Sequence, residues 1–277
     1  MDYMSDLALE RCVSLENGVD GVEMERSDNG EVTVTLVRIL TDAAAGKIGK
    51  PVGEYYTLEM TRFPDDAPLS EKRIEAVSAV IKKFLPPEGT ILVAGIGNAD
   101  MTSDALGPMT ASGVFATRYI SGNLKNQLGF ECDLRSVASV STGVLGKTGI
   151  ESGEFIKCIC SCVNPGAVIA VDALAASAAE RLGTTVQICN TGISPGAGVG
   201  NKRERIDEEL LGVPVISIGV PTVADIRVFT GENTPEALVV APKDIDVLVK
   251  NAASLLSFSL NRALQPGLTS REIYSLS

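Results

Sequence analysis

The chain has 277 residues, of which 45% are hydrophobic and 21% charged, and its formal net charge is −11. This composition is typical of a globular protein, and the negative charge disfavours long-range attraction to nucleic acids or anionic membranes. The sequence contains no histidine, which excludes Ser-His-Asp triads, Cys-His dyads and histidine-ligated metal sites.

The first predicted elements are two strands and a helix. Residues 31–40 alternate between apolar and polar side chains, which predicts a β-strand, and residues 55–61 predict a second strand. We expect these two strands to form an antiparallel ribbon at the edge of the main sheet. A helix with Ser70 as its N-cap should follow and end before Pro86, because its apolar residues recur at helical spacing.

From residue 90 onward, predicted strands alternate with predicted helices. The strands fall at residues 90–95, 131–139, 167–172, 184–189 and 213–219. The helices begin near Asp104 and cover residues 150–163, 173–182 and 242–264. This alternation predicts an α/β fold with three layers, α/β/α, in which a mainly parallel central sheet carries the N-terminal antiparallel ribbon at its edge. A chain of this length can form one large domain, so we expect a single domain over residues 1–277.

The location of the protein is predicted from what its sequence lacks. No apolar run approaches the roughly 18 residues that a membrane helix needs. The residues from Met1 to Asp6 have neither the basic nor the apolar part of a signal peptide. We therefore expect a cytoplasmic protein with no membrane partner and no direct nucleic-acid partner.

The cysteines do not indicate a metal site. Cys158, Cys160 and Cys162 lie close together, but zinc sites usually draw on two separated pairs, and this run has no second half with that spacing. We interpret the three as buried free thiols on a helix. We therefore expect no metal ion and no cofactor.

Two aspartates are the candidate catalytic residues. Open parallel sheets place their ligand crevice beyond the carboxyl ends of the strands. Asp104 follows the strand at 90–95 through a glycine-containing loop, and Asp172 is the last residue of the strand at 167–172. If these strands are neighbours, the two carboxyl groups share a proton and could activate water. The alternative, in which each aspartate only binds backbone amides at a helix N-terminus, stays open.

Two loops could complete such a site. Backbone amides after the strand at 90–95, or in the glycine-rich loop at 192–200, could stabilise an oxyanion, although the second loop is equally consistent with a plain surface turn. The basic residues after that loop could bind acidic residues of a substrate or simply be solvated. The candidates for substrate binding or the oxyanion loop are Gly97, Asn98, Gly196, Gly198, Asn201, Lys202 and Arg203. A dinucleotide site is disfavoured because Asp100 replaces the third glycine of its fingerprint.

Several long strings, in order over most of the chain, resemble the spore germination protease family. They lie at residues 6–10, 97–108, 144–154, 172–176, 192–203 and 218–223. The sequence departs from the family pattern at Ser103, where proline is commoner, and at Ser194, where many relatives have histidine. Its leader before Asp6 is also short, which leaves the processing site open.

The resemblance implies an endopeptidase that degrades small acid-soluble spore proteins during germination. The family is made as a zymogen that removes a short N-terminal propeptide, here within about residues 1–10, and assembles as tetramers. Its location would be the forespore or spore core, and its fold is related to that of hydrogenase maturation proteases and phosphorylases. Its proposed catalytic aspartates match Asp104 and Asp172, which makes it an atypical aspartic peptidase. The sequence does not assign base and acid between them.

Two other functions remain open at this point. Hydrogenase maturation endopeptidases share the Gly-x-Gly-Asn start, but they bind nickel with carboxylate and histidine ligands, and this chain has no histidine. Activity that survives chelation would separate the two families. The other alternative is a noncatalytic ligand-binding α/β module.

Overall fold

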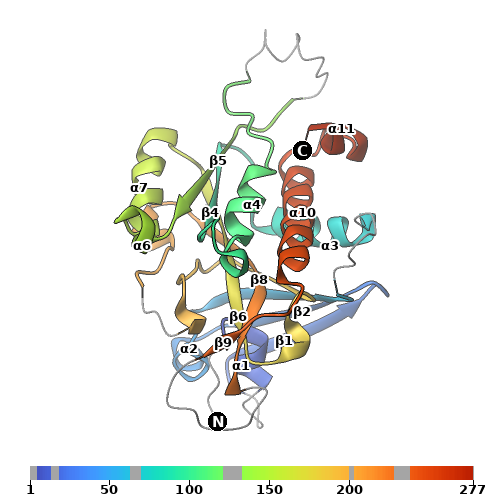
Figure 1. Cartoon of the computed structure of the whole chain (residues 1–277), viewed down its shortest axis with the longest axis vertical. Coiled ribbons are helices and arrows are strands. Elements are labelled where there is room, and N and C mark those ends of the chain that lie inside the picture. Colours follow the sequence, from blue (N-terminus) through green and yellow to red (C-terminus); the bar gives the residue numbers. More distant parts are fainter. Residues whose placement is uncertain are drawn as a thin grey trace.

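The computed structural model describes residues 5–13, 19–62, 70–120, 133–199, 203–227 and 238–276. Within them a nine-stranded sheet forms the centre of the molecule. Its strands are β1 (Val22–Asp28), β2 (Val32–Ile39), β3 (Gly53–Met60), β4 (Ile91–Ile96), β5 (Val137–Gly143), β6 (Ala167–Ala176), β7 (Thr185–Cys189), β8 (Val215–Asp225) and β9 (Val239–Val240). Their spatial order is β1-β2-β3-β7-β8-β6-β4-β5, with β9 beside β8 (Figure 1).

The sheet has a parallel part and an antiparallel part. β8, β6, β4 and β5 run parallel to one another, whereas β1, β2, β3 and β7 are antiparallel in turn, and β7 joins β8 antiparallel. The predicted α/β class and the antiparallel ribbon are therefore confirmed. The ribbon continues inward through β7, whose direction the sequence did not indicate.

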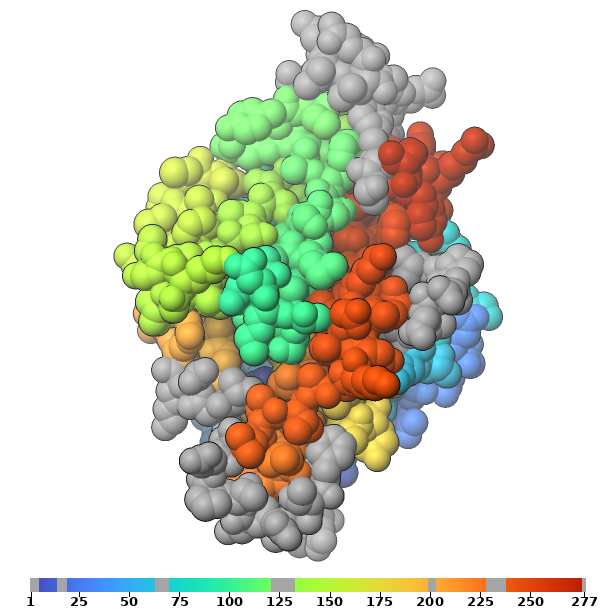
Figure 2. Space-filling model, viewed as in Figure 1, coloured from blue at the N-terminus to red at the C-terminus, as the bar shows by residue number. Residues whose placement is uncertain are grey.

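Helices cover the sheet on both faces. They are α1 (Ala8–Val13), α2 (Asp42–Ile48), α3 (Glu71–Phe84), α4 (Leu106–Ser112), α6 (Leu145–Thr148), α7 (Ser152–Val163), α8 (Glu208–Leu211), α10 (Ile245–Leu264) and α11 (Ser270–Leu276), with single 3₁₀ turns η1 (Thr102–Asp104), η2 (Ala179–Arg181) and η3 (Ala197–Val199). α3, α4 and α10 pack on one face, and α10 and α4 lie side by side in Figure 2. α7 and α8 pack on the opposite face.

The central strands explain this layering. In β4, Ile91 and Val93 face the α3/α10 layer, whereas Leu92 and Ala94 face the α7 layer. A strand with helices on both sides has no solvated face, which is why β4 is apolar at every position. In the part of the chain that the structure describes, no helix is both long enough and apolar enough to cross a bilayer.

The structure corrects several predicted boundaries. β6 runs on to Ala176, so Asp172 lies within the strand, and the helix predicted at 173–182 is wrong apart from the turn η2. The alanines there favour a helix, but pairing with β8 as far as Ala176 overrides that propensity. β5 starts at Val137, so residues 133–136 of the strand predicted at 131–139 are not part of it, and residues 131 and 132 lie outside the described residues.

Two further predictions are corrected near the ends of helices. Asp104 belongs to η1, and α4 begins only at Leu106, so Asp104 is not within the early turns of a helix. Of the three cysteines on α7, Cys160 is buried, while Cys158 and Cys162 are exposed. The amphipathic period of α7 turns these two outward, because residues two positions apart on a helix point in different directions.

Candidate active site

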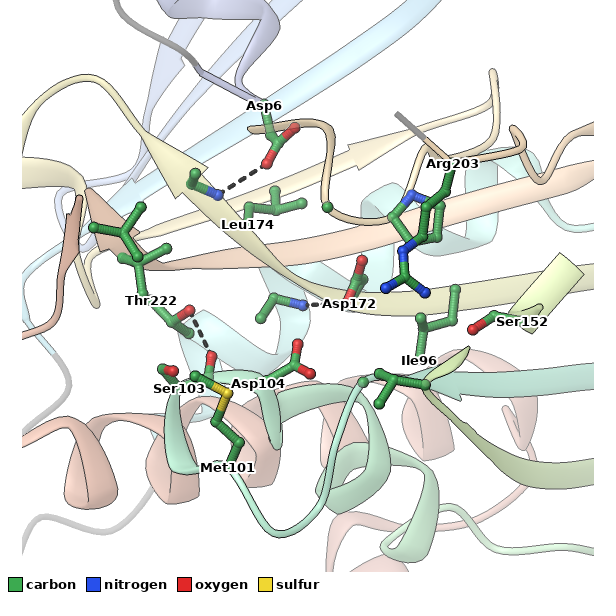
Figure 3. A pocket seen from close by; sticks show the side chains of 18 residues that line it. Asp6, Ile96, Met101, Ser103, Asp104, Ser152, Asp172, Leu174, Arg203 and Thr222 are labelled. Atoms are coloured by element: carbon green, nitrogen blue, oxygen red, sulfur yellow. Dashed lines mark hydrogen bonds between the residues drawn. The ribbon is translucent and has the colours of Figure 1, made fainter. Parts of the chain in front are cut away.

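A crevice of about 260 Å³ opens at the carboxyl ends of the parallel strands. Its lining comes from the loop after β4, from β6, from β8 and from the segment around Arg203. Asp104, Asp172 and Arg203 all point into it (Figure 3). Side chains from three separate parts of the sequence therefore meet where an open parallel sheet places its ligand site.

Asp172 owes its position to the unequal lengths of β4 and β6. Gly95 of β4 pairs with Val171, and β4 ends one residue later, while β6 continues against β8. Asp172 is thus the first residue of β6 that extends past its pairing with β4, and its side chain is only 4% exposed. Its Oδ1 accepts a hydrogen bond of 2.9 Å from the N–H of Ala173.

Asp104 is fixed by the backbone around it. Its Oδ2 accepts a hydrogen bond of 2.7 Å from the N–H of Asn98. Gly97 has φ +125°, and a Cβ there would lie 2.1 Å from the carbonyl oxygen of Asp104, so only glycine fits. Thr222 of β8 donates from Oγ1 to the carbonyl of Ser103 at 2.7 Å. These contacts tie η1 to both β4 and β8.

Gly107 brings the two aspartates to the same place. A Cβ on Gly107 would lie 2.2 Å from the carbonyl oxygen of Ile96 and 2.5 Å from that of Val171. The backbone of α4, three residues after Asp104, therefore rests directly on the ends of β4 and β6, where Val171 immediately precedes Asp172. η1 packs against β6 as a result, and both carboxyl groups face one space (Figure 3).

The crevice holds more negative than positive charge. Burial, together with the charges of Asp104 and Asp6, raises the pKa of Asp172 well above its ordinary value. Burial also raises the pKa of Asp104, against the opposing effects of the Asn98 N–H and of Arg203. A proton is therefore held in the crevice at a pH where exposed aspartates are ionised.

Arg203 is the cation of this crevice. Its guanidinium favours the ionised form of both Asp104 and Asp172, and its Nη1 lies 3.7 Å from Oε2 of Glu151. Glu151 is the N-cap residue of α7, so this ion pair connects α7 to the segment that carries Arg203. In the described ranges, no group of three or more cysteine, aspartate or glutamate side chains is placed to hold a metal ion.

A model of one peptidase family, described as germination protease, matches residues 5–235. The chain belongs to the germination protease family. The match covers the crevice residues from Asp6 to Val223 on β8, and only Val239 of β9 in the crevice lining lies beyond it. Membership of this family makes the chain a peptidase.

Individual members of the germination protease family match almost the whole chain. The germination protease of Caldanaerobacter subterraneus subsp. tengcongensis is 39% identical and is aligned over 98% of this chain and 97% of its own length. That of Clostridium tetani is 34% identical over 99% of each chain. That of Bacillus pumilus is 38% identical over 93% of this chain and 68% of its own length.

Among solved structures, a [NiFe] hydrogenase maturation protease from Thermococcus kodakarensis matches with a TM-score of 0.38 and 18% identity. It covers 65% of this chain and 98% of its own. This likeness is too low to carry an argument. The fold class follows from the order and direction of the strands in this chain.

Only some of the residues predicted to bind substrate line the crevice of this chain. Gly97, Gly196 and Arg203 line it. The amide of Asn98 is already bound to Asp104, so it is not a free oxyanion donor. Gly198 lies instead against Asp6, whose Oδ2 a Cβ on Gly198 would approach to 2.1 Å. Asn201 and Lys202 lie outside the described residues.

Several side chains that line the crevice were not predicted as site residues from the sequence, among them the polar residues Asp6, Ser152 and Thr222. Asp6 reaches it because the segment before α1 runs beside β6. The N–H of Asp6 donates to the carbonyl of Ala175 at 3.0 Å, and Oδ2 of Asp6 accepts from the N–H of Ala175 at 2.9 Å. No local pattern signals this contact, since it joins residues 169 positions apart.

Replacement of Arg203 by methionine is expected to move the acid limb of the pH–rate profile to higher pH. Arg203 lowers the pKa of both aspartates, so its loss lets the pair keep its proton to a higher pH, and the ionised base forms later. Profiles of kcat/KM against pH would measure the shift. Arg203→Lys keeps the positive charge and should shift the limb less, and an unchanged limb in Arg203→Met would contradict the assignment.

Proposed function

We propose that this chain is an endopeptidase that degrades small acid-soluble spore proteins during germination and uses Asp104 and Asp172 as its catalytic pair. The observation that carries the proposal is that one crevice holds both the buried Asp172 and the half-buried Asp104, with the pKa of each raised. Strongly perturbed carboxyl groups that face one cavity are typical of catalytic sites. Membership of the germination protease family supports the reaction class.

The mechanism follows from the shared proton. The ionised member of the pair takes a proton from a water molecule, which attacks the scissile carbonyl carbon. The protonated member donates to the departing amine, so the pair ends the cycle with the same single proton. Asp172 is the more deeply buried of the two, which favours it as the member that holds the proton.

Stabilisation of the tetrahedral intermediate requires donors at the oxyanion. Gly97 and Gly196 line the crevice together with the pair, and Arg203 supplies a positive charge. These groups are our candidates for oxyanion and substrate contacts. A substrate chain would then lie across the carboxyl ends of β4, β6 and β8.

The zymogen part of the proposal concerns the segment before α1. Its Asp6 lines the crevice and is bound to Ala175 through both its backbone and its carboxylate. This carboxylate also raises the pKa of Asp172. The position of Asp6 beside the catalytic pair supports self-processing within about residues 1–10.

Incubation of the full chain is expected to remove N-terminal residues from the wild-type protein and not from Asp172→Asn. The reason is that self-processing and substrate cleavage would use the same pair. Intact-mass spectrometry over a time course reads the N-terminus directly. Equal processing of both proteins would show that the cut does not depend on Asp172.

The remaining parts of the proposal concern assembly and location. By family membership we propose a homo-oligomer, with a tetramer as the expected state, in the cytoplasm of the forespore or the spore core. Small acid-soluble spore proteins are the proposed partners as substrates. No direct nucleic-acid partner and no membrane partner are proposed, in keeping with a net charge of −11.

A further inference from the structure

A second cavity, of about 120 Å³, lies next to the catalytic crevice, and Asp6 and Leu174 line both. Its walls are polar. They include Tyr55 of β3, Ser217 of β8 and, from the turn after α2, Lys50. A water molecule needs roughly 10–15 Å³ of such space, so the cavity has room for several waters or one small polyatomic ion.

Lys50 is the unusual residue of this cavity. Among the described residues, no acceptor or carboxylate lies within hydrogen-bonding or ion-pair distance of its ammonium group. An ammonium has three N–H donors, and leaving them unused away from bulk water is costly. Burial is the main reason why the pKa of Lys50 is lowered. The charge of Asp6 opposes this effect of burial, but Asp6 is not within ion-pair distance of Lys50. The half-buried Lys50 therefore has no directly bound counter-ion among the described residues.

Arg205 adds a second positive charge to the same cavity. Its Nε lies 3.2 Å from Oδ2 of Asp207, and its Nη2 donates to the carbonyl of Thr191. Arg205 is thus held in place by its own partners and contributes mainly through its field. Arg11 also acts on Lys50 as a nearby like charge.

Among the described residues, Asp6 is the one carboxylate that lines this cavity, and its oxygens already accept hydrogen bonds from the backbone. Its carboxylate accepts hydrogen bonds from the backbone N–H groups of Ala175 and Gly198. Tyr55 also lines the cavity, and burial raises the pKa of its hydroxyl, so it is neutral near pH 7. The Cys189 thiol contacts the Ser217 hydroxyl at 2.9 Å. The charged groups that line the cavity are two cations and one anion.

We propose that this cavity binds a free small oxyanion, of the size and charge of inorganic phosphate, with the Lys50 ammonium as its principal ligand. Ser194 and Ser217 also line the cavity, and their hydroxyl groups would donate to the remaining oxygens of the bound ion. A tetrahedral oxyanion presents enough acceptors for the three ammonium donors and these hydroxyls together. A nucleotide is too large for a space of about 120 Å³.

Titration of the full-length chain with inorganic phosphate tests the site, by isothermal calorimetry at an ionic strength held constant with chloride. Saturable binding of one phosphate per chain is expected. Lys50→Met is expected to weaken it at least about tenfold, the usual scale for loss of a charge-assisted hydrogen bond. Lys47→Met is the matched control, because Lys47 is exposed on the last turn of α2 and does not line the cavity.

Lys50→Gln provides a second variant, which keeps a polar side chain of similar length without the charge. Its unfolding temperature in chloride should be at least that of the wild type, because a half-buried ammonium without a partner in ion-pair distance has been removed. Phosphate should raise the unfolding temperature of the wild type but not that of Lys50→Gln. Absence of saturable binding, or equal phosphate effects in wild type and both Lys50 variants, would overturn the proposal. Cleavage is not measured, so the result is independent of the proposed peptidase function.

Discussion

Asp172→Asn is expected to slow peptide-bond cleavage by at least about a hundredfold while leaving the fold intact, since a positioned acid or base typically contributes roughly 10²–10⁴-fold. Asparagine keeps the size of the side chain and its contact with the Ala173 N–H, but it can neither hold nor release the shared proton. Asp100→Asn is the matched control. Asp100 is an exposed carboxylate on the same loop as Asp104 and pairs with Lys147, so its loss should change the rate little.

Stability gives this variant an independent signature. Because the pKa of Asp172 is raised in the folded protein, the unfolded chain loses its proton first as pH rises from the ordinary value of an aspartate. Wild-type stability therefore falls between that value and the raised one, and a permanently neutral asparagine side chain at this position removes this loss. Asp172→Asn should be at least as stable as the wild type near neutral pH. A clear loss of stability would mean that the variant disrupts packing, and its activity could not then be read as catalysis.

Gly107→Ala is expected to lower the free energy of unfolding by about 3 kcal/mol, at the upper end of the usual range for overpacking. The added methyl group would meet backbone atoms of Ile96 and Val171, which cannot rotate away as a flexible side chain would. α4 would have to move off the ends of β4 and β6, and η1 with Asp104 would move with it. Cleavage should therefore fall even in the fraction of molecules that stays folded.

Denaturant unfolding followed by circular dichroism measures this change. Gly146→Ala is the control, because Gly146 also lies in a short helix but has open space around its Cβ position. Alanine there should be neutral or slightly stabilising. If Gly107→Ala unfolded at the same denaturant concentration as the wild type, the close contact of α4 with the two strands would not hold the site together.

The sequence predicts the central strands well because burial on both faces leaves a plain signal. β4 is a short apolar run and β7 is buried along its whole length, and their predicted bounds are correct to within one residue. β2 alternates with a period of two, and its prediction is also confirmed. These elements depend on local hydrophobic pattern, which the sequence contains in full.

Other elements depend on pairing that no local pattern reports. The alanine-rich stretch after Asp172 favours a helix by propensity, yet it extends β6 because β8 lies beside it. β8 is itself longer than predicted, as it runs to Asp225 beside this extension. Both errors fall at the crevice, where β6 extends beyond the end of β4 and thereby sets the position of Asp172.

Only part of the candidate site was predictable from the sequence. Asp104 and Asp172 follow from the rule that ligands bind at the carboxyl ends of parallel strands. The position of Asp6 follows from a contact with Ala175, which is far away in the sequence. The loop geometry also directs the Asn98 N–H to the Asp104 carboxylate, so this amide is not free to bind an oxyanion. Long-range backbone contacts of this kind become visible only in three dimensions.

The most direct test of the shared-proton mechanism is a side-by-side cleavage assay. It would measure the rate at which a small acid-soluble spore protein is cleaved by the wild type, by Asp104→Asn, by Asp172→Asn and by the double variant. Two carboxyl groups that act as one unit predict that each single change removes most of the activity and that the double variant is no slower than either. Near wild-type rates in both single variants, or losses that simply multiply in the double variant, would contradict the mechanism.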